Sequence, residues 1–381
     1  MKQQVLNAID RPELWIPALR GKRVGLITNP SGVSRELRLT SDILWSEGLL
    51  TCLFSPEHGV RGDLQAGDNV ETYTDSRTGL PVHSLYGKGK RHIPTEVMEG
   101  LDAVAFDIQD VGARFYTYIY TLSFAMEDCA AAGKEMIVFD RLNPLGGYIE
   151  GTLLEPEHAS TIGRFPIATR FGMTVGEYAR FINETQGIGC RLTVLPIAGW
   201  SRDTLFSETD LSWVAPSPNI PTTDANLCYI GTCLAEGTNL SEGRGTTKPF
   251  ETVGAPWLDA EGVADFMNGL NLPGVRFRPC AFVPTFSKHQ GELCRGVQLH
   301  IKNQREFRPF EAGLRLVEYI RRTHEEFAVR RPNVNGLYFM DLLMGCSDFR
   351  STSFDLEAFL QRQSLLLEKY RQDIRPYLLY N

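Results

Sequence analysis

Short apolar runs alternate with amphipathic stretches through the first half of the chain. The apolar runs predict buried strands at residues 22–28, 49–54, 102–108, 135–139 and 191–197. The amphipathic stretches predict helices at residues 34–48, 117–132 and 174–184. Strands that are joined by helical crossovers pair in parallel, so the pattern predicts an α/β fold with a mainly parallel, doubly wound sheet.

The second half of the chain has a different pattern. Thr222 or Thr223 is expected to cap a helix that runs through Ala235, and a glycine-rich loop with charges of both signs follows at residues 236–248. Beyond residue 251 we predict helices at 259–269, 309–326 and 355–370 and strands at 275–284 and 296–302. We therefore expect a catalytic domain at residues 1–250 and a smaller α+β domain at residues 251–381.

Polar side chains follow four of the predicted strands, where each strand ends. They are Asn29, then Glu57 and His58, then Asp107, Asp110 and Arg114, and finally Asp140 and Arg141. The carboxyl ends of parallel strands meet at one edge of an open sheet, which is where such sheets bind ligands. We expect these residues to converge on one crevice, with the loop at residues 236–248 as its second wall.

Several of these residues have an alternative structural explanation. Glu57 can cap a helix or form a surface ion pair, although Pro56 and Gly59 describe a tight turn after a buried strand and favour catalysis. An acid beside an arginine is often a structural pair, which applies to Asp107 and Asp110. Arg114 is then either the partner of these acids or a clamp for an anionic substrate.

Composition excludes several classes of protein. The 381 residues are 43% hydrophobic and 22% charged, and no apolar run approaches the ~20 residues that cross a bilayer. A net charge of −7 without a basic cluster argues against nucleic-acid binding. The eight cysteines form no Cys-x-x-Cys pair, which favours buried free thiols. Without a visible secretory signal at the N-terminus, we expect a cytoplasmic protein.

Familiar cofactor and nucleophile motifs are missing from the sequence. It has neither a His-Glu-x-x-His metal helix nor a Gly-x-Gly-x-x-Gly or Walker sequence, so we expect no metal and no nucleotide cofactor. It also lacks the Gly-x-Ser-x-Gly elbow of serine hydrolases. The rings of Tyr116 and Tyr118 belong either to the core or to the rim of a site, and aromatic faces suit sugar rings.

Six motifs carry a resemblance to a known family. They are Ile27–Val33, Phe54–Gly62, Asp75–Val82, Phe106–Tyr118, Asp140–Pro144 and Glu242–Thr247. Together they resemble the exo-β-N-acetylmuramidase family, long known as a domain of unknown function. The resemblance implies a Rossmann-like N-terminal domain with a smaller C-terminal domain. It also implies removal of terminal N-acetylmuramic acid from the non-reducing end of peptidoglycan fragments, with Glu57 as the leading catalytic carboxylate.

Glycoside cleavage requires groups that this sequence supplies. One carboxyl protonates the leaving oxygen and a second group activates water or stabilises the oxocarbenium-like centre; His58, Asp107, Asp110 and Glu242 are candidates beside Glu57. The lactyl carboxylate needs a cation, for which Arg114, Arg141 and Arg244 are candidates. We expect further substrate contacts from Asn29, Arg61, Tyr116, Tyr118, Asp140, Asn219 and His289.

Two rival functions use the same crevice. A muropeptide-binding protein would bind the sugar without turnover, and a nucleotide- or phosphate-handling α/β enzyme would be protected by nucleotides. The sequence leaves open the choice among retaining, inverting and substrate-assisted mechanisms, and also the oligomeric state.

Overall fold

A seven-stranded sheet forms the centre of the computed structural model, which describes residues 2–56, 59–62, 72–85, 87 and 91–381. The strand order is β3-β4-β2-β1-β5-β6-β9, and β3 alone runs antiparallel to its neighbour. The strands are β1 (Val24–Thr28), β2 (Leu50–Ser55), β3 (Tyr73–Thr74), β4 (Pro81–Ser84), β5 (Ala103–Asp107), β6 (Glu135–Phe139) and β9 (Arg191–Leu195). The predicted mainly parallel, doubly wound sheet is confirmed.

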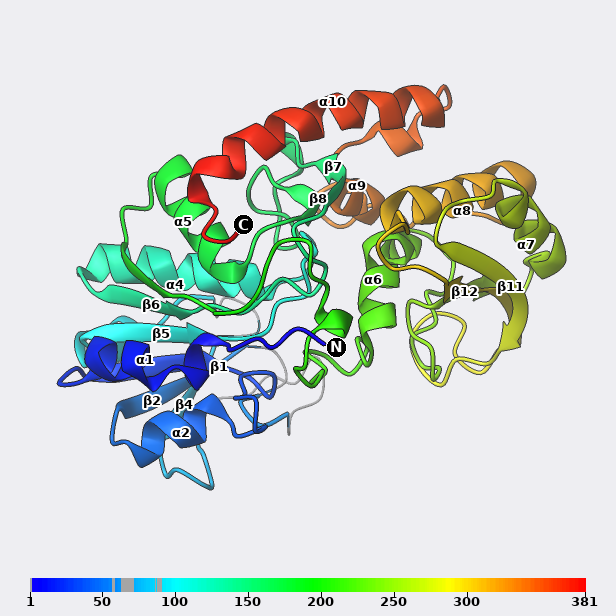
Figure 1. Cartoon of the computed structure of the whole chain (residues 1–381). Coiled ribbons are helices and arrows are strands. Elements are labelled where there is room, and N and C mark those ends of the chain that lie inside the picture. Colours follow the sequence, from blue (N-terminus) through cyan, green and yellow to red (C-terminus); the bar gives the residue numbers. More distant parts are fainter. Residues whose placement is uncertain (1, 57–58, 63–71, 86, 88–90) are drawn as a thin grey trace.

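Helices cover both faces of this sheet (Figure 1). One face packs against α3 (Thr95–Glu99), α4 (Tyr118–Ala132) and α5 (Val175–Thr185), and the other against α1 (Pro12–Leu19) and α2 (Thr40–Ser46). The central strands are therefore buried on both sides, which explains why they read as continuous apolar runs. Thr174 and Glu177 form a reciprocal capping box that fixes the start of α5.

The helix that we predicted at residues 34–48 is much shorter in the structure. Only Thr40–Ser46 is helical, and residues 29–39 form a loop over the end of the sheet. Leu37 has a φ of 58° and is 54% exposed, so it lies neither in a helix nor in the core. Its apolar side chain fitted a helical period that the backbone does not adopt.

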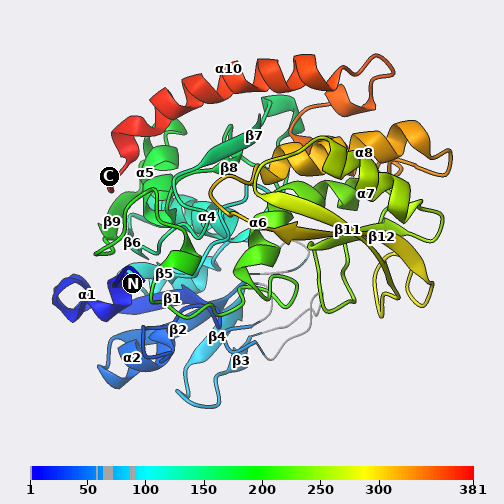
Figure 2. The same cartoon turned by 45° about the vertical axis from the view of Figure 1, so that its right-hand side comes forward.

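An antiparallel three-stranded sheet forms the second domain (Figure 2). Its order is β10 (Thr252–Ala255), β12 (Cys294–Ile301) and β11 (Val275–Phe282). It lies with α6 (Thr223–Thr232), α7 (Ala260–Gly269), α8 (Pro309–Thr323) and α9 (Phe339–Met344). Thr222 accepts a hydrogen bond from the backbone N–H of Ala225 at 3.0 Å, which confirms that it caps α6.

The hydrophobic cores of the two domains do not separate at residue 250, where we predicted the domain boundary. Helix α6 packs against α8, and its residues share one apolar cluster with the strands after residue 251. In the opposite direction, α10 (Leu356–Ile374) returns to the first domain and packs beside the hairpin of β7 (Ile149–Leu153) and β8 (Ala168–Phe171). Residues 223–250 therefore pack with the second domain, and much of the C-terminal helix packs with the first.

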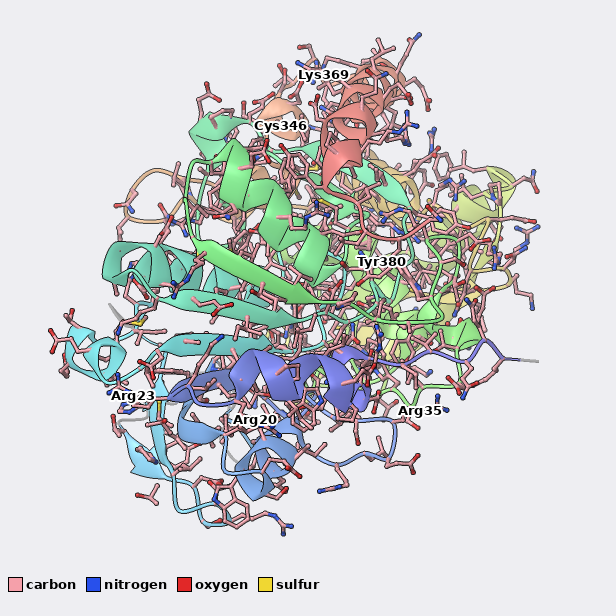
Figure 3. All side chains as sticks on the ribbon, turned by 60° about the vertical axis from the view of Figure 1, so that its left-hand side comes forward. Arg20, Arg23, Arg35, Cys346, Lys369 and Tyr380 are labelled. Carbon is pink, nitrogen blue, oxygen red and sulfur yellow. The ribbon has the colours of Figure 1, made fainter. Side chains whose placement is uncertain are left out.

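The end of the chain reaches the carboxyl edge of the central sheet, where Figure 3 labels Tyr380. The Tyr380 hydroxyl donates to Asp140 at 2.6 Å and accepts from the N–H of Ile197 at 3.1 Å. All eight cysteines are free thiols, as predicted, and seven of them are buried. Within the described ranges, no helix combines the length and apolar character that a membrane span requires.

Candidate active site

The carboxyl edge of the sheet holds a buried ion pair between Asp107 and Arg141. Asp107 is 0% exposed, and its two oxygens accept hydrogen bonds from Arg141 Nε at 2.5 Å and from an Arg141 terminal nitrogen at 2.8 Å. The Thr40 hydroxyl donates to the same carboxylate, and Arg141 also reaches the carbonyl of Val33 at 2.8 Å. Asp107 therefore has its partners within the protein, which corrects its predicted catalytic role, and Arg141 is its buried counter-ion rather than the substrate contact that we predicted.

Asp140 anchors two chain segments at this edge. Its carboxylate accepts hydrogen bonds from the hydroxyls of Thr174 at 2.8 Å and Tyr380 at 2.6 Å and from the N–H of Gly176 at 2.8 Å. Burial raises its pKa to about 7. We predicted a substrate contact, but Asp140 instead holds the start of α5 and the end of the chain together.

Arg114 is the largest correction to the predicted site. It is 0% exposed, and its guanidinium donates to the carbonyls of Thr152, Ile167 and Leu343 at 2.6, 3.1 and 2.8 Å. Burial lowers its pKa to about 10. Arg114 therefore joins the first domain to α9 of the second, and it is enclosed by the protein rather than turned towards a substrate.

Arg61 and Asn29 are also bound within their own loops. Arg61 forms ion pairs with Asp75 at 2.5 Å and Asp42 at 2.9 Å, and it holds the pKa of the Asp75 carboxyl well below its usual range. Asn29 accepts hydrogen bonds from the N–H and hydroxyl of Ser31 at 2.9 and 2.6 Å. Arg61 is thus held by two carboxylates, in contrast to the substrate contact that we predicted, whereas the amide nitrogen of Asn29 has no hydrogen-bond partner among the described residues and its predicted contact stays a prediction.

Asp110 has a different environment from its neighbours. It is 4% exposed; its Oδ2 accepts from the N–H of Gly112 at 2.7 Å, and its Oδ1 has no hydrogen-bond partner among the described residues. Burial raises its pKa to about 7. Burial also raises the pKa of the Tyr116 hydroxyl, and the charge of Asp110 adds to that shift. Asp110 is thus a buried acid with spare hydrogen-bonding capacity.

Two adjoining pockets form a groove along the boundary between the domains. The first, of about 200 Å³, is lined by aromatic rings, including Tyr116, Tyr118, Tyr229 and Phe339, and by Asn219. The second, of about 540 Å³, is lined by charged side chains that include Glu242, Lys288, His289 and Arg330. Glu236 and Arg244 line both, so we treat the two pockets as one feature, the interdomain groove.

The aromatic part of the groove is well ordered by its own contacts. The rings of Tyr116 and Tyr118 meet edge to face with centroids 4.9 Å apart, and Tyr118 donates to the carbonyl of Pro216 at 3.0 Å. Tyr229 meets Phe115 edge to face at 5.0 Å. Both rings line the pocket while packing on their neighbours, and Tyr118 is also part of the apolar core of the first domain.

The charges of the groove are arranged in pairs. Arg244 lies 2.8 Å from Glu236 and 3.3 Å from Glu242, and Lys288 lies 2.9 Å from Glu242. Glu242 is 2% exposed, so its charge serves mainly to hold these two cations. His289 has a φ of 57°, and its Nε2 lies 2.7 Å from the carbonyl oxygen of Asn239.

Comparison with known proteins identifies the family. A family model described as the N-terminal part of the exo-β-N-acetylmuramidase NamZ matches residues 24–224, and the C-terminal model matches residues 227–380. The chain belongs to the NamZ exo-β-N-acetylmuramidase family. The boundary between the two models falls at α6, where the core of the second domain begins.

Named and solved relatives support the same assignment. The peptidoglycan β-N-acetylmuramidase NamZ of Bacillus subtilis is 51% identical over 311 residues, which are 81% of this chain and 75% of that protein. Two crystal structures of DUF1343 family proteins from Bacteroides fragilis have the same fold. One has a TM-score of 0.90, 35% identity and complete coverage of both chains; the other has 0.77, 27% and 99% coverage of both. The predicted family and glycosidase class are confirmed.

In this muramidase the structure brings together only part of the predicted site. Tyr116, Tyr118, Asn219, Arg244, Glu242 and His289 line the groove, and the charge of Asp110 contributes to the raised pKa of the Tyr116 hydroxyl. Asp107, Arg114, Asp140 and Arg141 are instead buried in hydrogen-bond networks of the interior. Glu57 and His58 fall outside the described residues, so their predicted roles stay predictions.

Several residues of the groove were missed by the sequence reasoning. Glu236 and Lys288 stood in loops that we recognised as polar, but nothing in their spacing distinguished them. Arg330 lies in the connection between α8 and α9, and no motif or pattern in the sequence around it indicated a binding role. As for metals, the described ranges contain no group of three or more His, Cys, Asp or Glu residues that could hold an ion.

Proposed function

We propose that this exo-β-N-acetylmuramidase binds a terminal N-acetylmuramic acid residue of a peptidoglycan fragment in the interdomain groove. The observation that carries the proposal is a pocket walled by aromatic rings and paired ions, in which the pKa of the Tyr116 hydroxyl responds to the charge of Asp110, a buried acid with an unpartnered oxygen. Sugar rings present apolar C–H faces that pack on aromatic rings, while their hydroxyl and acetamido groups need polar partners. The groove offers both.

The reaction that we propose is hydrolysis of the terminal β-glycosidic bond. The bond from the anomeric carbon to the bridging oxygen breaks, a proton passes to that oxygen, and water adds to the anomeric carbon. The products are free N-acetylmuramic acid and a glycan that is one residue shorter at its non-reducing end. The reaction needs no oxidant or cofactor.

We assign the proton transfer to the leaving oxygen to Glu57. The family resemblance supports this choice, and so does its place directly after β2, next to β1 in the sheet. His58 follows it in the same loop and is the candidate for fixing the protonation state of Glu57.

Asp110 is the second carboxyl group in this proposal. A pKa of about 7 keeps a large share of it protonated near neutral pH, so it can donate a hydrogen bond through the group that the protein leaves unpartnered. This suits an acid that orients the acetamido group in a substrate-assisted reaction, and a deprotonated Asp110 would instead activate water.

A chromogenic β-N-acetylmuramide tests the proposal directly. We expect release of the chromophore, and much slower release from the matching β-N-acetylglucosaminide. A muropeptide-binding protein would bind the muramide without turnover. A nucleotide-handling enzyme would be stabilised against thermal unfolding by nucleotides but not by amino sugars. Either of these outcomes would overturn the proposal.

A further inference from the structure

The cations of the interdomain groove differ in how far the protein neutralises them. Arg244 has two carboxylate partners, Glu236 and Glu242, and Lys288 lies 2.9 Å from Glu242. Lys288 also donates to the carbonyl of Ala235 at 2.7 Å. The positive charge of each side chain is therefore already offset by at least one carboxylate.

Arg330 is the exception among these cations. Within the described ranges no carboxylate lies in ion-pair distance of its guanidinium, and its side-chain hydrogen bond is a long one, 3.4 Å to the carbonyl of Glu236. The residue is exposed and lines the charged pocket. Three cations therefore face two glutamates in this pocket, and the excess positive charge resides on Arg330.

The position of Arg330 is fixed by the fold. Its N–H donates to the carbonyl of Gly237 at 2.9 Å, and the preceding residue, Val329, pairs with Thr238 in an antiparallel bridge. Its guanidinium lies 5.4 Å from the centroid of the Phe339 ring, which lines the aromatic pocket. Arg330 thus stands where the aromatic and charged pockets meet, with a flat cation stacked on a ring.

We infer that Arg330 binds the carboxylate of the substrate and is the residue that selects N-acetylmuramic acid over N-acetylglucosamine. This inference rests on the proposed function. The two sugars differ by a lactyl ether with one carboxylate, and a guanidinium binds one carboxylate through two parallel hydrogen bonds. A sugar that lies on the aromatic rings would extend this substituent across Phe339 to Arg330.

The inference replaces the candidates that the sequence suggested. Arg114 is enclosed among main-chain carbonyls, Arg141 is the buried counter-ion of Asp107, and Arg244 is neutralised by two glutamates. In this arrangement Arg244 lines the groove and holds Glu236 and Glu242 in place through its ion pairs. Arg330 alone among the four combines exposure to the groove with an unneutralised charge.

A comparison of substrates with and without the free carboxylate tests the inference. The substrates are a chromogenic β-N-acetylmuramide, its lactyl methyl ester and the matching β-N-acetylglucosaminide. We expect Arg330→Gln to lower kcat/KM on the muramide by about 100-fold. The same variant should lose far less on the ester and on the glucosaminide, because these lack the charge that Arg330 recognises. Arg330→Lys should lose an intermediate amount, since it keeps the charge without the planar fork.

The neighbouring Arg331 provides a matched control. It is exposed and lines neither pocket, so Arg331→Gln should keep the wild-type ratio between muramide and ester. Equal losses of Arg330→Gln on all three substrates, at an unchanged melting temperature, would show that Arg330 does not recognise the carboxylate. So would a wild-type enzyme that hydrolyses acid and ester equally well. If the wild-type enzyme hydrolyses none of the three, the proposed function itself is wrong.

Discussion

Charged residues gather in two neighbouring regions of this enzyme, the carboxyl edge of the central sheet and the interdomain groove. At the sheet edge, Asp107, Asp140 and Arg141 are buried and bind one another or nearby main-chain and hydroxyl groups. In the groove, Arg244 and Lys288 are partly exposed, and Arg330 keeps a charge without a carboxylate partner. The sheet edge thus has little capacity left for a ligand, whereas the groove retains it.

The difference shows that, at the edge of an α/β sheet where ligands bind, structural residues and ligand-binding residues can lie at different distances from the strand ends. The residues directly after the strands form an inner layer that ties the loops together. Asp110 stands at the transition, because one of its oxygens is used by Gly112 and the other is free. The residues that we expect to meet the substrate come from farther along the loops and from the second domain.

The largest effect that the comparison predicts is on stability, at the sheet edge. Arg141→Met leaves Asp107 buried without its partner, and we expect a loss of ~3–5 kcal/mol in the free energy of unfolding. Denaturant titration measures it. Arg23→Met, which removes an exposed pair with Asp102, is the control and should change the midpoint little. An Arg141→Met protein with wild-type stability but no activity would place Arg141 in the reaction instead.

A smaller effect, on turnover alone, is expected at the loop after β2. Glu57→Gln removes a proton donor at nearly constant shape, so we expect kcat on the chromogenic muramide to fall at least ~100-fold at an unchanged melting temperature. A variant that keeps more than about a tenth of the wild-type rate would show that another acid protonates the leaving oxygen.

The pH dependence of stability gives a test of Asp110, which stands at the transition between the two regions. Its folded-state pKa of about 7 lies above its ordinary value of 3.8, so the folded state holds this proton more tightly than the unfolded state. The contribution of this group to stability is therefore largest in acid and is lost as the pH rises from about 4 through 7. We expect Asp110→Asn to be more stable than wild type at pH 8, by on the order of 2 kcal/mol, and to lose this advantage at pH 4.

The same variant separates a catalytic from a structural Asp110. We expect its turnover to fall about 10-fold or more and the inflection near pH 7 to disappear from its rate profile. A variant that is stabilised at pH 8 but keeps the wild-type rate profile would assign the buried acid to the fold alone.

The smallest effect is expected from a metal chelator. Neither region offers a set of three metal ligands among the described residues, so prolonged treatment with a strong chelator should leave kcat and KM on the muramide unchanged. A loss of activity that added zinc restores would contradict this expectation.

Much of the fold followed from the sequence alone. Five strands of the central sheet were predicted to within two residues. Three of them, β1, β5 and β6, are buried on both faces and leave continuous apolar runs. The helix at residues 34–48 failed because an exposed Leu37 completed a helical period by chance. The short strands β3 and β10 and the hairpin of β7 and β8 left no distinct pattern, since their pairing depends on distant partners.

For the site, the sequence by itself determined the family motifs, the sheet edge and most of the residues that surround it. It did not determine which of them are free to bind a ligand. Arg114 and Arg330 are both arginines in polar surroundings, yet one is enclosed by three carbonyls and the other faces the groove. Burial and saturation are set by contacts between segments far apart in the chain, such as Arg114 with Leu343 and Arg330 with Phe339. Only the tertiary structure brings these partners together, and it thereby decides which charges belong to the scaffold and which are left for the substrate.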